Sequence, residues 1–428
     1  MLRAFRKLWK DDRGNILVIF GAALPLLVGA AGLANDTIQW TLWKRQLQRA
    51  ADSAAIAGVY DREAAAGSTA GTTDAVTHDL TLNQHTWMAL KTGYPQVTFP
   101  AASGVMRYQV RVSLAIQQRL PFSSMFLSTA PTIVANATAA SIPAGGDACI
   151  EALDPNAVTG VNFNGNAAIY MPDCDIFSNS AGTNSAIAKG SSDVTANSVG
   201  SVGGIQESNN FHVTAYRPYS PPMEDPFADV TPDPSKMNCG SGNVVLDENT
   251  DFSKLNGVNC FSSLSVKPNS TLVVPPNFGP IYLNGGGVDF KGNFTCTGCT
   301  IVMTNKDAAS PIGNITTNAT ANINITAPTS GDFKGLAIYQ DRRATDCSNC
   351  NKINGNSLSV ITGGIYFPTQ ELQYNGTGNT VATCTMFVSK RVTFIGNSGV
   401  SNKFKKLAEC SAFGLPSSAT TRMVRLVG

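Results

Sequence analysis

Side chains that could carry out acid–base chemistry are few and scattered in this chain. The three histidines, His78, His85 and His212, have no neighbouring Cys or Asp pattern, so structural or solvated roles are the simpler interpretation. Cleavage of a glycan needs two carboxylates about 5–10 Å apart, or a basic residue beside a carboxylate. The group that could meet this need is Asp332, Asp341, Arg342, Arg343 and Asp346, although a solvated loop is the ordinary explanation for it. No phosphate loop, G-x-S-x-G or H-E-x-x-H motif occurs, so we expect no catalytic residues and no cofactor.

All ten cysteines lie between Cys149 and Cys410. An even number confined to one part of a chain is typical of disulfides formed in an oxidising compartment. Two CxxC pairs, Cys296/Cys299 and Cys347/Cys350, could instead bind zinc or act in redox chemistry. They are much further apart in the chain than the roughly 15–20 residues of a zinc ribbon. We therefore favour disulfides over a metal site and over a redox site.

Cys239 and Cys260 are predicted to form a disulfide, because they are one repeat of the β region apart. Ten cysteines leave other connectivities open. The other pairs that we predict are Cys149–Cys174, Cys296–Cys299, Cys347–Cys350 and Cys384–Cys410.

An uncharged, apolar run extends from Ile16 to Ala34 and contains Pro25, which we expect to bend a helix there. Its length suits a helix that crosses a bilayer of about 30 Å, so residues 14–35 are predicted to span a membrane. Residues 1–13 carry five basic residues against two aspartates. Basic flanks stay in the cytoplasm, so the rest of the chain is predicted to be exported. A cleaved secretory signal is the alternative interpretation.

Small residues in this run would let a partner helix approach closely within the bilayer. Lipid-facing small residues in an unpartnered anchor are the competing explanation. The predicted partner face comprises Gly21, Ala22, Gly29 and Gly32, with Asp36 just outside the bilayer.

Residues 36–148 are predicted to form a juxtamembrane helix and a small α+β module. Apolar residues recur at spacings of three and four on one face of the helix: Trp43, Leu47, Ala50, Ala51, Ala54 and Gly58. Alternating polarity predicts a half-buried strand over 107–117, and a second strand is expected over 132–139. Between them, the apolar segment 120–127 either packs into the core or contacts the membrane, and core packing is the commoner outcome.

Residues 149–428 are predicted to form a right-handed β-solenoid, with a β-sandwich as the alternative. Glycines recur every 20–22 residues, with short apolar strands between them, and such a period is typical of solenoids: Gly292, Gly313, Gly335, Gly355, Gly376 and Gly396. An earlier block, from Cys149 to about Val213, resembles this pattern. The Pro-rich segment 216–235 is expected to be a loop that leaves the solenoid, or a linker.

Composition agrees with a mainly β, exported protein that has one long N-terminal helix. Only 14% of the 428 residues are charged and the net charge is +2, which gives no electrostatic basis for binding nucleic acid. Gly and Asn suit tight turns, and Thr suits strands.

The order Arg-Gly, apolar run with an internal Pro, Gly-Leu-Ala-x-Asp, then Leu-Gln-x-Ala-Ala-Asp-Ser-Ala-Ala resembles the N-terminal segment of TadE/TadG-like proteins of the Flp (tight adherence) pilus machinery. In such proteins Gly14 would precede the cleavage point of a pilin-type signal, and a Glu would stand where this chain has Ile19. The resemblance therefore favours the TadG type, which stays anchored. The Asp-x-Ser-x-Ser string of a von Willebrand A domain is absent from the sequence.

The resemblance implies a non-enzymatic, single-pass protein of the bacterial inner membrane, with its N-terminus in the cytoplasm and its bulk in the periplasm or at the surface. Its helix would dock with pilin-like or other Tad assembly proteins. One alternative is an adhesin that binds carbohydrate or another surface. A second alternative is a β-helix polysaccharide lyase or glycosidase.

Overall fold

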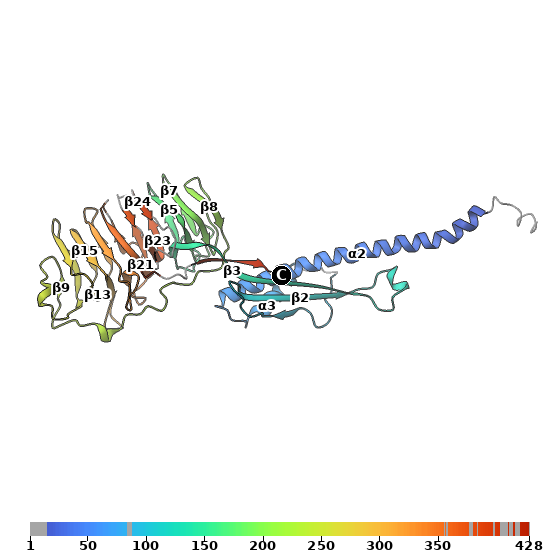
Figure 1. Ribbon diagram of the computed structural model, residues 1–428, viewed down its shortest axis with the longest axis horizontal. Helices are drawn as coiled ribbons and strands as arrows, with labels where there is room; N and C mark the ends of the chain where they lie inside the picture. Colours follow the sequence, from blue (N-terminus) through green and yellow to red (C-terminus); the bar gives the residue numbers. More distant parts are fainter. Residues whose placement is uncertain are drawn as a thin grey trace, which may run out of the picture. The chain divides into compact units, whose positions relative to one another are not determined.

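The structure is a computed structural model that describes residues 15–83, 88–354, 356, 358–375, 380–382, 384–396, 399–402, 410, 414–415 and 420–427. Two compact units make up the chain: Met1–Ile142 with Val424–Gly428, and Pro143–Met423. The fold is mainly β, with one long N-terminal apolar helix and a second helix, α3 (Thr72–Asn83), which the sequence did not predict (Figure 1).

Helix α2 (Asn15–Ala64) is continuous for 50 residues and runs through Pro25. At 1.5 Å per residue it is roughly 75 Å long, more than twice the thickness of a bilayer core. Helix propensity accounts for its C-terminal half, because Ala-rich sequence follows Trp43. The predicted spanning segment and the predicted juxtamembrane helix are therefore one element without a break at residue 35 or 36.

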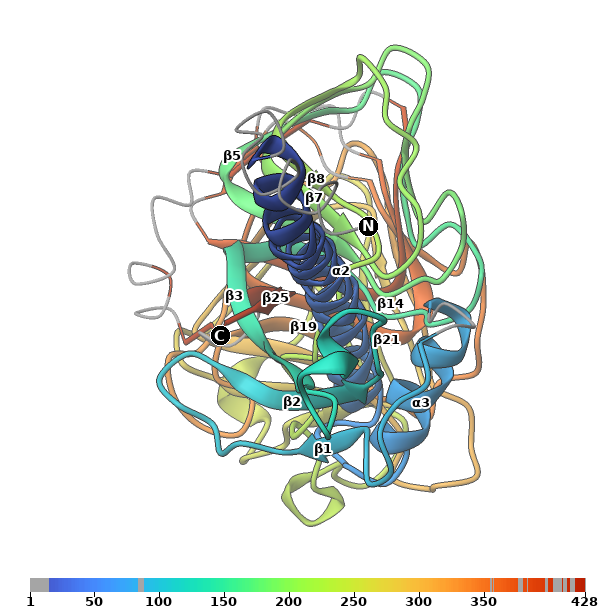
Figure 2. The same ribbon diagram turned by 90° about the vertical axis from the view of Figure 1, so that its right-hand side faces the viewer.

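The first unit packs α2 and α3 against an antiparallel sheet of β1 (Gln96–Thr98), β2 (Arg107–Gln117) and β3 (Thr132–Ala152) (Figure 2). Strand β2 has the predicted bounds, and its apolar side chains at 110, 112, 114 and 116 are buried. They meet the predicted helix face, on which Leu47, Ala51 and Ala54 are fully buried. Gly58 completes this face, because a Cβ there would press on Val110.

The last strand, β25 (Thr420–Leu426), brings the end of the chain back to the first unit. Val424 packs against the helix–sheet core, and the Val427 N–H donates to Thr138 O at 2.8 Å. The prediction that these residues belong to the C-terminal β region is therefore wrong for Val424–Gly428, because sequence order does not show a return to the first unit.

The second unit is built from strands in two sequence blocks, and every pairing among its described residues is parallel. The first block continues β3 with β4 (Val161–Phe163), β5 (Ala168–Ser178), β6 (Ala186–Ala188), β7 (Asp193–Ser201) and β8 (Phe211–Arg217). The second block comprises β9 (Val245–Leu246), β10 (Cys260–Phe261), β11 (Ser263–Val266), β12 (Thr271–Val274), β13 (Gly279–Asn284), β14 (Val288–Phe290), β15 (Asn293–Thr297), β16 (Cys299–Thr304), β17 (Ile315–Thr317), β18 (Ile323–Thr326), β19 (Leu336–Gln340), β20 (Asn351–Ile353), β21 (Val360–Tyr374), β22 (Thr380–Ala382), β23 (Thr385–Phe394) and β24 (Gly399–Asn402).

The predicted constant repeat is wrong, because strand pairing advances by unequal steps. Glu371 pairs with Arg391, a step of 20 residues, whereas Ile301 pairs with Ile338, a step of 37. The longer steps include loops between strands, so the distance in sequence between glycines is not the length of one layer. Gly396, Gly165 and Gly190 stack on one another across the two blocks, and all three have a positive φ near +70°.

The spatial order of the strands differs from their order in the chain. Strand β23 pairs with β3 and β4, as Phe387 with Ile150 and Val392 with Val161. The chain therefore enters the stack in its middle, proceeds through β5 and β7 to one end at β8, and then crosses to β9 at the other end (Figure 1). From there it returns layer by layer until β23 meets β3.

The Pro-rich segment makes this crossing and packs along the stack, so it is neither a linker nor a departing loop. We call residues 218–236 the strap. The Ser220 N–H donates to Ser201 O, and Met223 exchanges two hydrogen bonds with the Asn179 amide. Further along, the Tyr339 hydroxyl donates to Val230 O at 3.0 Å. Prolines suit this path, because a segment outside the sheets needs few backbone donors.

One buried row of side chains lies on the strand face that the strap covers. By strand register, Tyr339, Tyr366, Val388 and Glu151 occupy successive layers of this row. Glu151 is fully buried, and neither carboxylate oxygen has a hydrogen-bond partner. Burial, followed by the nearby negative charge of Asp225, raises the pKa of the Glu151 carboxyl well above its usual value.

Five disulfides brace the second unit: Cys149–Cys174, Cys239–Cys260, Cys296–Cys299, Cys347–Cys350 and Cys384–Cys410. These are the pairs that the sequence predicted. Aromatic rings fill the interior. Phe290 stacks on Phe294 within one layer at 4.6 Å between centroids, and Phe163 stacks on Phe394 of the neighbouring layer at 5.2 Å.

Replacing Phe227 with Ala should detach the strap and lower the free energy of unfolding by about 3–5 kcal/mol, because this buried ring packs edge-on against Tyr366 at 5.4 Å. Urea unfolding of the full-length protein, followed by far-ultraviolet circular dichroism, measures the change. Tyr170→Ala is the control, because Tyr170 is an exposed strand residue. Equal stability of the two variants would show that the strap contributes little.

Replacing Glu151 with Gln should remove a pH dependence of stability. The raised pKa means that the folded state keeps a proton that the unfolded state releases, so wild-type stability falls as the pH rises from the ordinary Glu range toward the raised pKa. The free energy of unfolding of E151Q should therefore rise relative to that of the wild type as the pH increases. Paired denaturation curves at acidic and mildly alkaline pH test this, with the exposed Glu207→Gln as control. The same change in stability with pH in the wild type and in E151Q would contradict this prediction.

Candidate functional site

The N-terminal part of α2 presents an apolar surface that the rest of the first unit does not cover. Ile19, Leu24, Leu26 and Val28 are all exposed, and Leu26 is the most exposed of them, at 75%. The continuous buried apolar face of the helix begins at Trp43. Among the described residues, α2 is the one helix long and apolar enough to cross a membrane.

The structure divides the small-residue face predicted for a partner helix into an open part and a covered part. Gly21 and Ala22 are exposed, and a Cβ added at Gly21 or Gly29 would meet no other atom within 4 Å. Gly32 and Asp36, one and two turns further along, are buried. A partner helix could therefore reach the part from Gly21 to Gly29.

The covering element is the connection between β2 and β3, which includes the 3₁₀ turn η2 (Ser123–Met125). The Phe122 ring lies where a Cβ of Gly32 would stand, so this position excludes any larger residue unless the ring moves. The Ser123 N–H donates to Asp36 Oδ2 at 2.5 Å, while Asp36 Oδ1 is buried without a partner. Asp36 is thus a bracing residue within the unit and does not face a partner.

Polar contacts tie the C-terminal half of α2 to strand β3. The Lys44 ammonium donates to Val134 O, and the Gln48 amide donates to Asn136 O at 2.7 Å. These bonds hold the helix against the sheet edge while Leu47 and its neighbours fill the core.

Gly14 of the expected processing motif lies outside the residues that the structure describes. Ile19, which stands where a pilin-type signal would carry Glu, is exposed on α2.

The structure pairs each member of the candidate catalytic group with a different residue. The Arg343 guanidinium contacts Asp341 at 2.7 Å, and the Arg342 guanidinium contacts Asp225 at 3.3 Å. Burial raises the pKa of the Asp341 carboxyl, but the hydrogen bonds from Arg343 and Thr304 outweigh burial and hold this pKa below its usual value. Asp332 pairs with Lys236.

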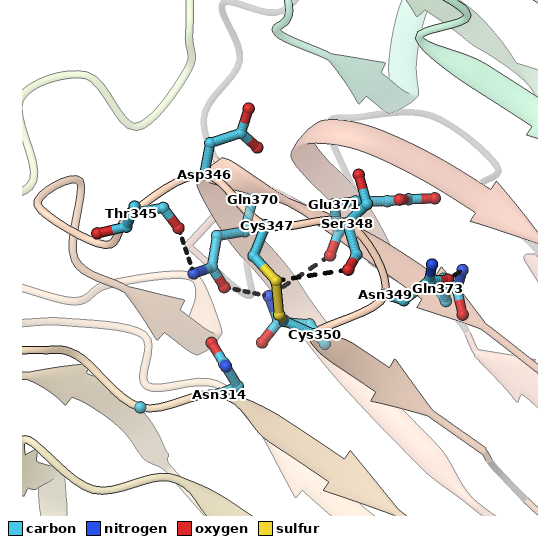
Figure 3. The surroundings of a disulfide bond; sticks show 12 residues. Asn314, Thr345, Asp346, Cys347, Ser348, Asn349, Cys350, Gln370, Glu371 and Gln373 are labelled. Carbon is cyan, nitrogen blue, oxygen red and sulfur yellow. Dashed lines mark hydrogen bonds between the residues drawn. A yellow bond between two sulfur atoms is a disulfide. The ribbon is translucent and has the colours of Figure 1, made fainter.

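The fifth member, Asp346, lies beside the Cys347–Cys350 disulfide (Figure 3). It accepts hydrogen bonds from Lys390 and Arg391, both at 2.7 Å, and Arg391 reaches on to Asp154 at 2.7 Å. These ion pairs link the disulfide loop to the following layers. The five groups do not converge on one position, so we interpret them as structural.

The strap supplies the contacts that sequence reasoning missed. Asp225 accepts a hydrogen bond from the Tyr366 hydroxyl at 2.6 Å, and Arg342 Nη2 donates to the Phe227 carbonyl. Burial and the Asp225 charge raise the pKa of Tyr366, which keeps this hydroxyl a donor. Sequence offers no signal for these contacts, because Asp225 precedes Arg342 by more than a hundred residues.

Both CxxC pairs are disulfide-bonded, which removes the thiolates that zinc would require. The described residues contain no cluster of three or more His, Cys, Asp or Glu side chains that could hold a metal ion.

Comparison with known proteins identifies the N-terminal segment. Residues 14–66 match the family described as putative Flp pilus-assembly TadE/G-like. No curated protein and no solved structure matches the chain. The matched residues cover α2, whose apolar surface and buried face are described above, and end just after it. The N-terminal segment of this protein is therefore similar to the TadE/G-like Flp pilus-assembly family along α2.

Proposed function

We propose that this protein is a non-enzymatic, single-pass component of a Flp/Tad-type pilus assembly or surface-attachment system, held in the bacterial inner membrane by α2. The observation that carries the proposal is that the segment matched by the pilus-assembly family is also the helix with an uncovered apolar surface. Lipid or another helix is the environment that such a surface requires.

Two features support an N-terminus in the cytoplasm and an exported bulk. Residues 1–13 contain five basic residues, which favour the cytoplasmic side. The five disulfides of the second unit suit an oxidising periplasm or cell surface. The TadG-type assignment rests on Ile19, because a chain without Glu at this position is expected to stay anchored and unprocessed.

We propose that α2 docks with pilin-like or other Tad assembly proteins through Gly21, Ala22 and Gly29. These positions share one side of the helix and are open. Helices associate in a bilayer largely through van der Waals packing, because lipid tails are as apolar as the helices, and small residues allow the close backbone approach that this packing needs.

We further propose that the second unit is a right-handed β-solenoid. Its all-parallel pairing and its aromatic rings stacked between layers support a solenoid over a sandwich of antiparallel hairpins. The stack would offer a surface for assembly or attachment.

A cavity of ≈ 380 Å³ favours a second candidate function, the binding of a surface glycan by an adhesin. Its lining includes Tyr282, Thr300 and the Lys236–Asp332 ion pair, which together combine an aromatic ring with hydrogen-bonding groups. Burial, followed by the charge of Asp332, raises the pKa of the Tyr282 hydroxyl to about 12.

Deleting the protein from its source bacterium separates the two functions. Loss of pili, seen by electron microscopy, is the expected result, because a missing membrane component stops assembly. Restoration by the full-length chain is the control. Retained pili with lost attachment would overturn the assembly role in favour of the adhesin.

Replacing Gly29 with Leu should sharply reduce pilus number and co-purification with a pilin-like protein. An overpacked helix contact costs about 1–3 kcal/mol, or roughly 5- to 150-fold in affinity. Ala31→Leu is the matched control, because Ala31 is exposed and lies about 160° around α2 from Gly29. Equal piliation of the two variants would rule out docking through this face.

A further inference from the structure

The connection between β2 and β3 ends in a row of exposed apolar side chains. Met125 and Phe126 are 76% and 70% exposed, and the neighbouring Leu127 is also exposed. The sequence left open whether this segment packs into the core or contacts the membrane. In the structure Leu120, Phe122 and Ser123 are packed, and the residues after Ser123 are exposed.

The exposed side chains are held in place by the structure on both sides of them. Phe122 packs on Gly32, and the Ser123 N–H donates to Asp36, as described above. The Leu127 N–H donates back to Ser123 O at 2.9 Å. The Arg119 guanidinium donates to Ser128 O at 3.1 Å, across the base of the loop. A braced turn thus presents three apolar side chains.

The bracing contacts fix the level of this turn along α2. Gly32 lies in the last turn of the uncharged run, and Asp36 is the first charged residue after it. These residues mark the point at which a spanning α2 would leave the hydrocarbon. The connection extends along α2 toward the N-terminus of the helix, past the end of the sheet (Figure 1). Bulky apolar side chains with a flanking Arg at this level suit the boundary between acyl chains and headgroups.

We propose that residues 122–127 form a second membrane contact, with Met125, Phe126 and Leu127 inserted into the outer leaflet of the membrane that α2 crosses. The occupant is lipid and not another protein, because the exposed row continues the apolar surface of the spanning helix at the same depth. The contact would fix the rotation of α2 about its axis and so the direction in which Gly21 and Gly29 face. The inference rests on the proposed anchoring of α2.

Site-specific quenching tests the proposal with the full-length protein in vesicles of phosphatidylethanolamine and phosphatidylglycerol. All ten cysteines are in disulfides, so Met125→Cys introduces a single thiol for an environment-sensitive fluorophore. Val105→Cys is the matched control, because Val105 is 65% exposed near the other end of β2, about 30 Å away. Leu26→Cys reports on α2 itself. Quenchers are lipids with a nitroxide near the headgroup or deep in the acyl chain.

We expect the deep nitroxide to quench the label at Leu26, and the shallow nitroxide to quench the label at Met125 several-fold more than the label at Val105. Equal quenching at Met125 and Val105, with Leu26 quenched, would overturn the second contact and leave the anchor intact. It would point to a protein partner for the exposed row. An unquenched Leu26 would overturn the anchor and the inference together.

A pair of glycine variants tests the bracing in the Met125→Cys background. Gly32→Ala would displace the Phe122 ring and should lower quenching at Met125 several-fold, whereas Gly29→Ala enters open space and should leave quenching unchanged. Unchanged quenching in Gly32→Ala would show that Gly32 does not position the loop.

Discussion

The parallel pairing of β23 with β3 and β4 holds the second unit together. Without this pairing, the strands before the strap and the strands after it would form two separate stacks. Each stack would expose a row of unpaired backbone N–H and C=O groups at the junction. The pairing buries these edges and brings Phe394 onto Phe163 and Gly396 onto Gly165. Because β23 lies near the end of the chain, the unit is complete only when nearly the whole chain is present.

The strap is the consequence of this arrangement. A chain that starts in the middle of a stack must travel its length once without joining a sheet, and the Pro-rich segment does so against one face. Its contacts use the charged residues that seemed capable of chemistry, because Arg342 holds Asp225 and the Phe227 carbonyl. Asp341 and Asp346 are likewise paired within and between layers. Charges that satisfy each other in this way stabilise the stack and leave no free acid–base pair at these positions.

Helix α2 has to suit two environments, and its sequence changes where the environment changes. Up to about Leu33 its exposed side chains are apolar all round, which is tolerable only in lipid or against another helix. From Trp43 onward only one face is apolar, and the sheet of β2 and β3 covers that face. The β2–β3 connection meets the helix between these two regions, at Gly32 and Asp36. The segment that resembles pilus-assembly proteins is thus the part of the chain that joins the uncovered apolar surface of α2 to the helix–sheet core.

The sequence alone determined the features that depend on local pattern. The apolar run of α2, its later one-sided face, strand β2 with its bounds and the Cys239–Cys260 pair follow from periodicity, length and spacing, and the structure contains all of them. Only the tertiary structure decided the features that depend on contacts between distant residues: the entry of the chain at the middle of the stack, the path of the strap, the unequal steps between layers and the return of β25 to the first unit. The same holds for Gly32 and Asp36, which lie on the predicted helix face but are covered by Phe122 and Ser123. A pattern within one element shows which face is apolar, but the segment that covers that face is set by long-range packing, which no local spacing encodes.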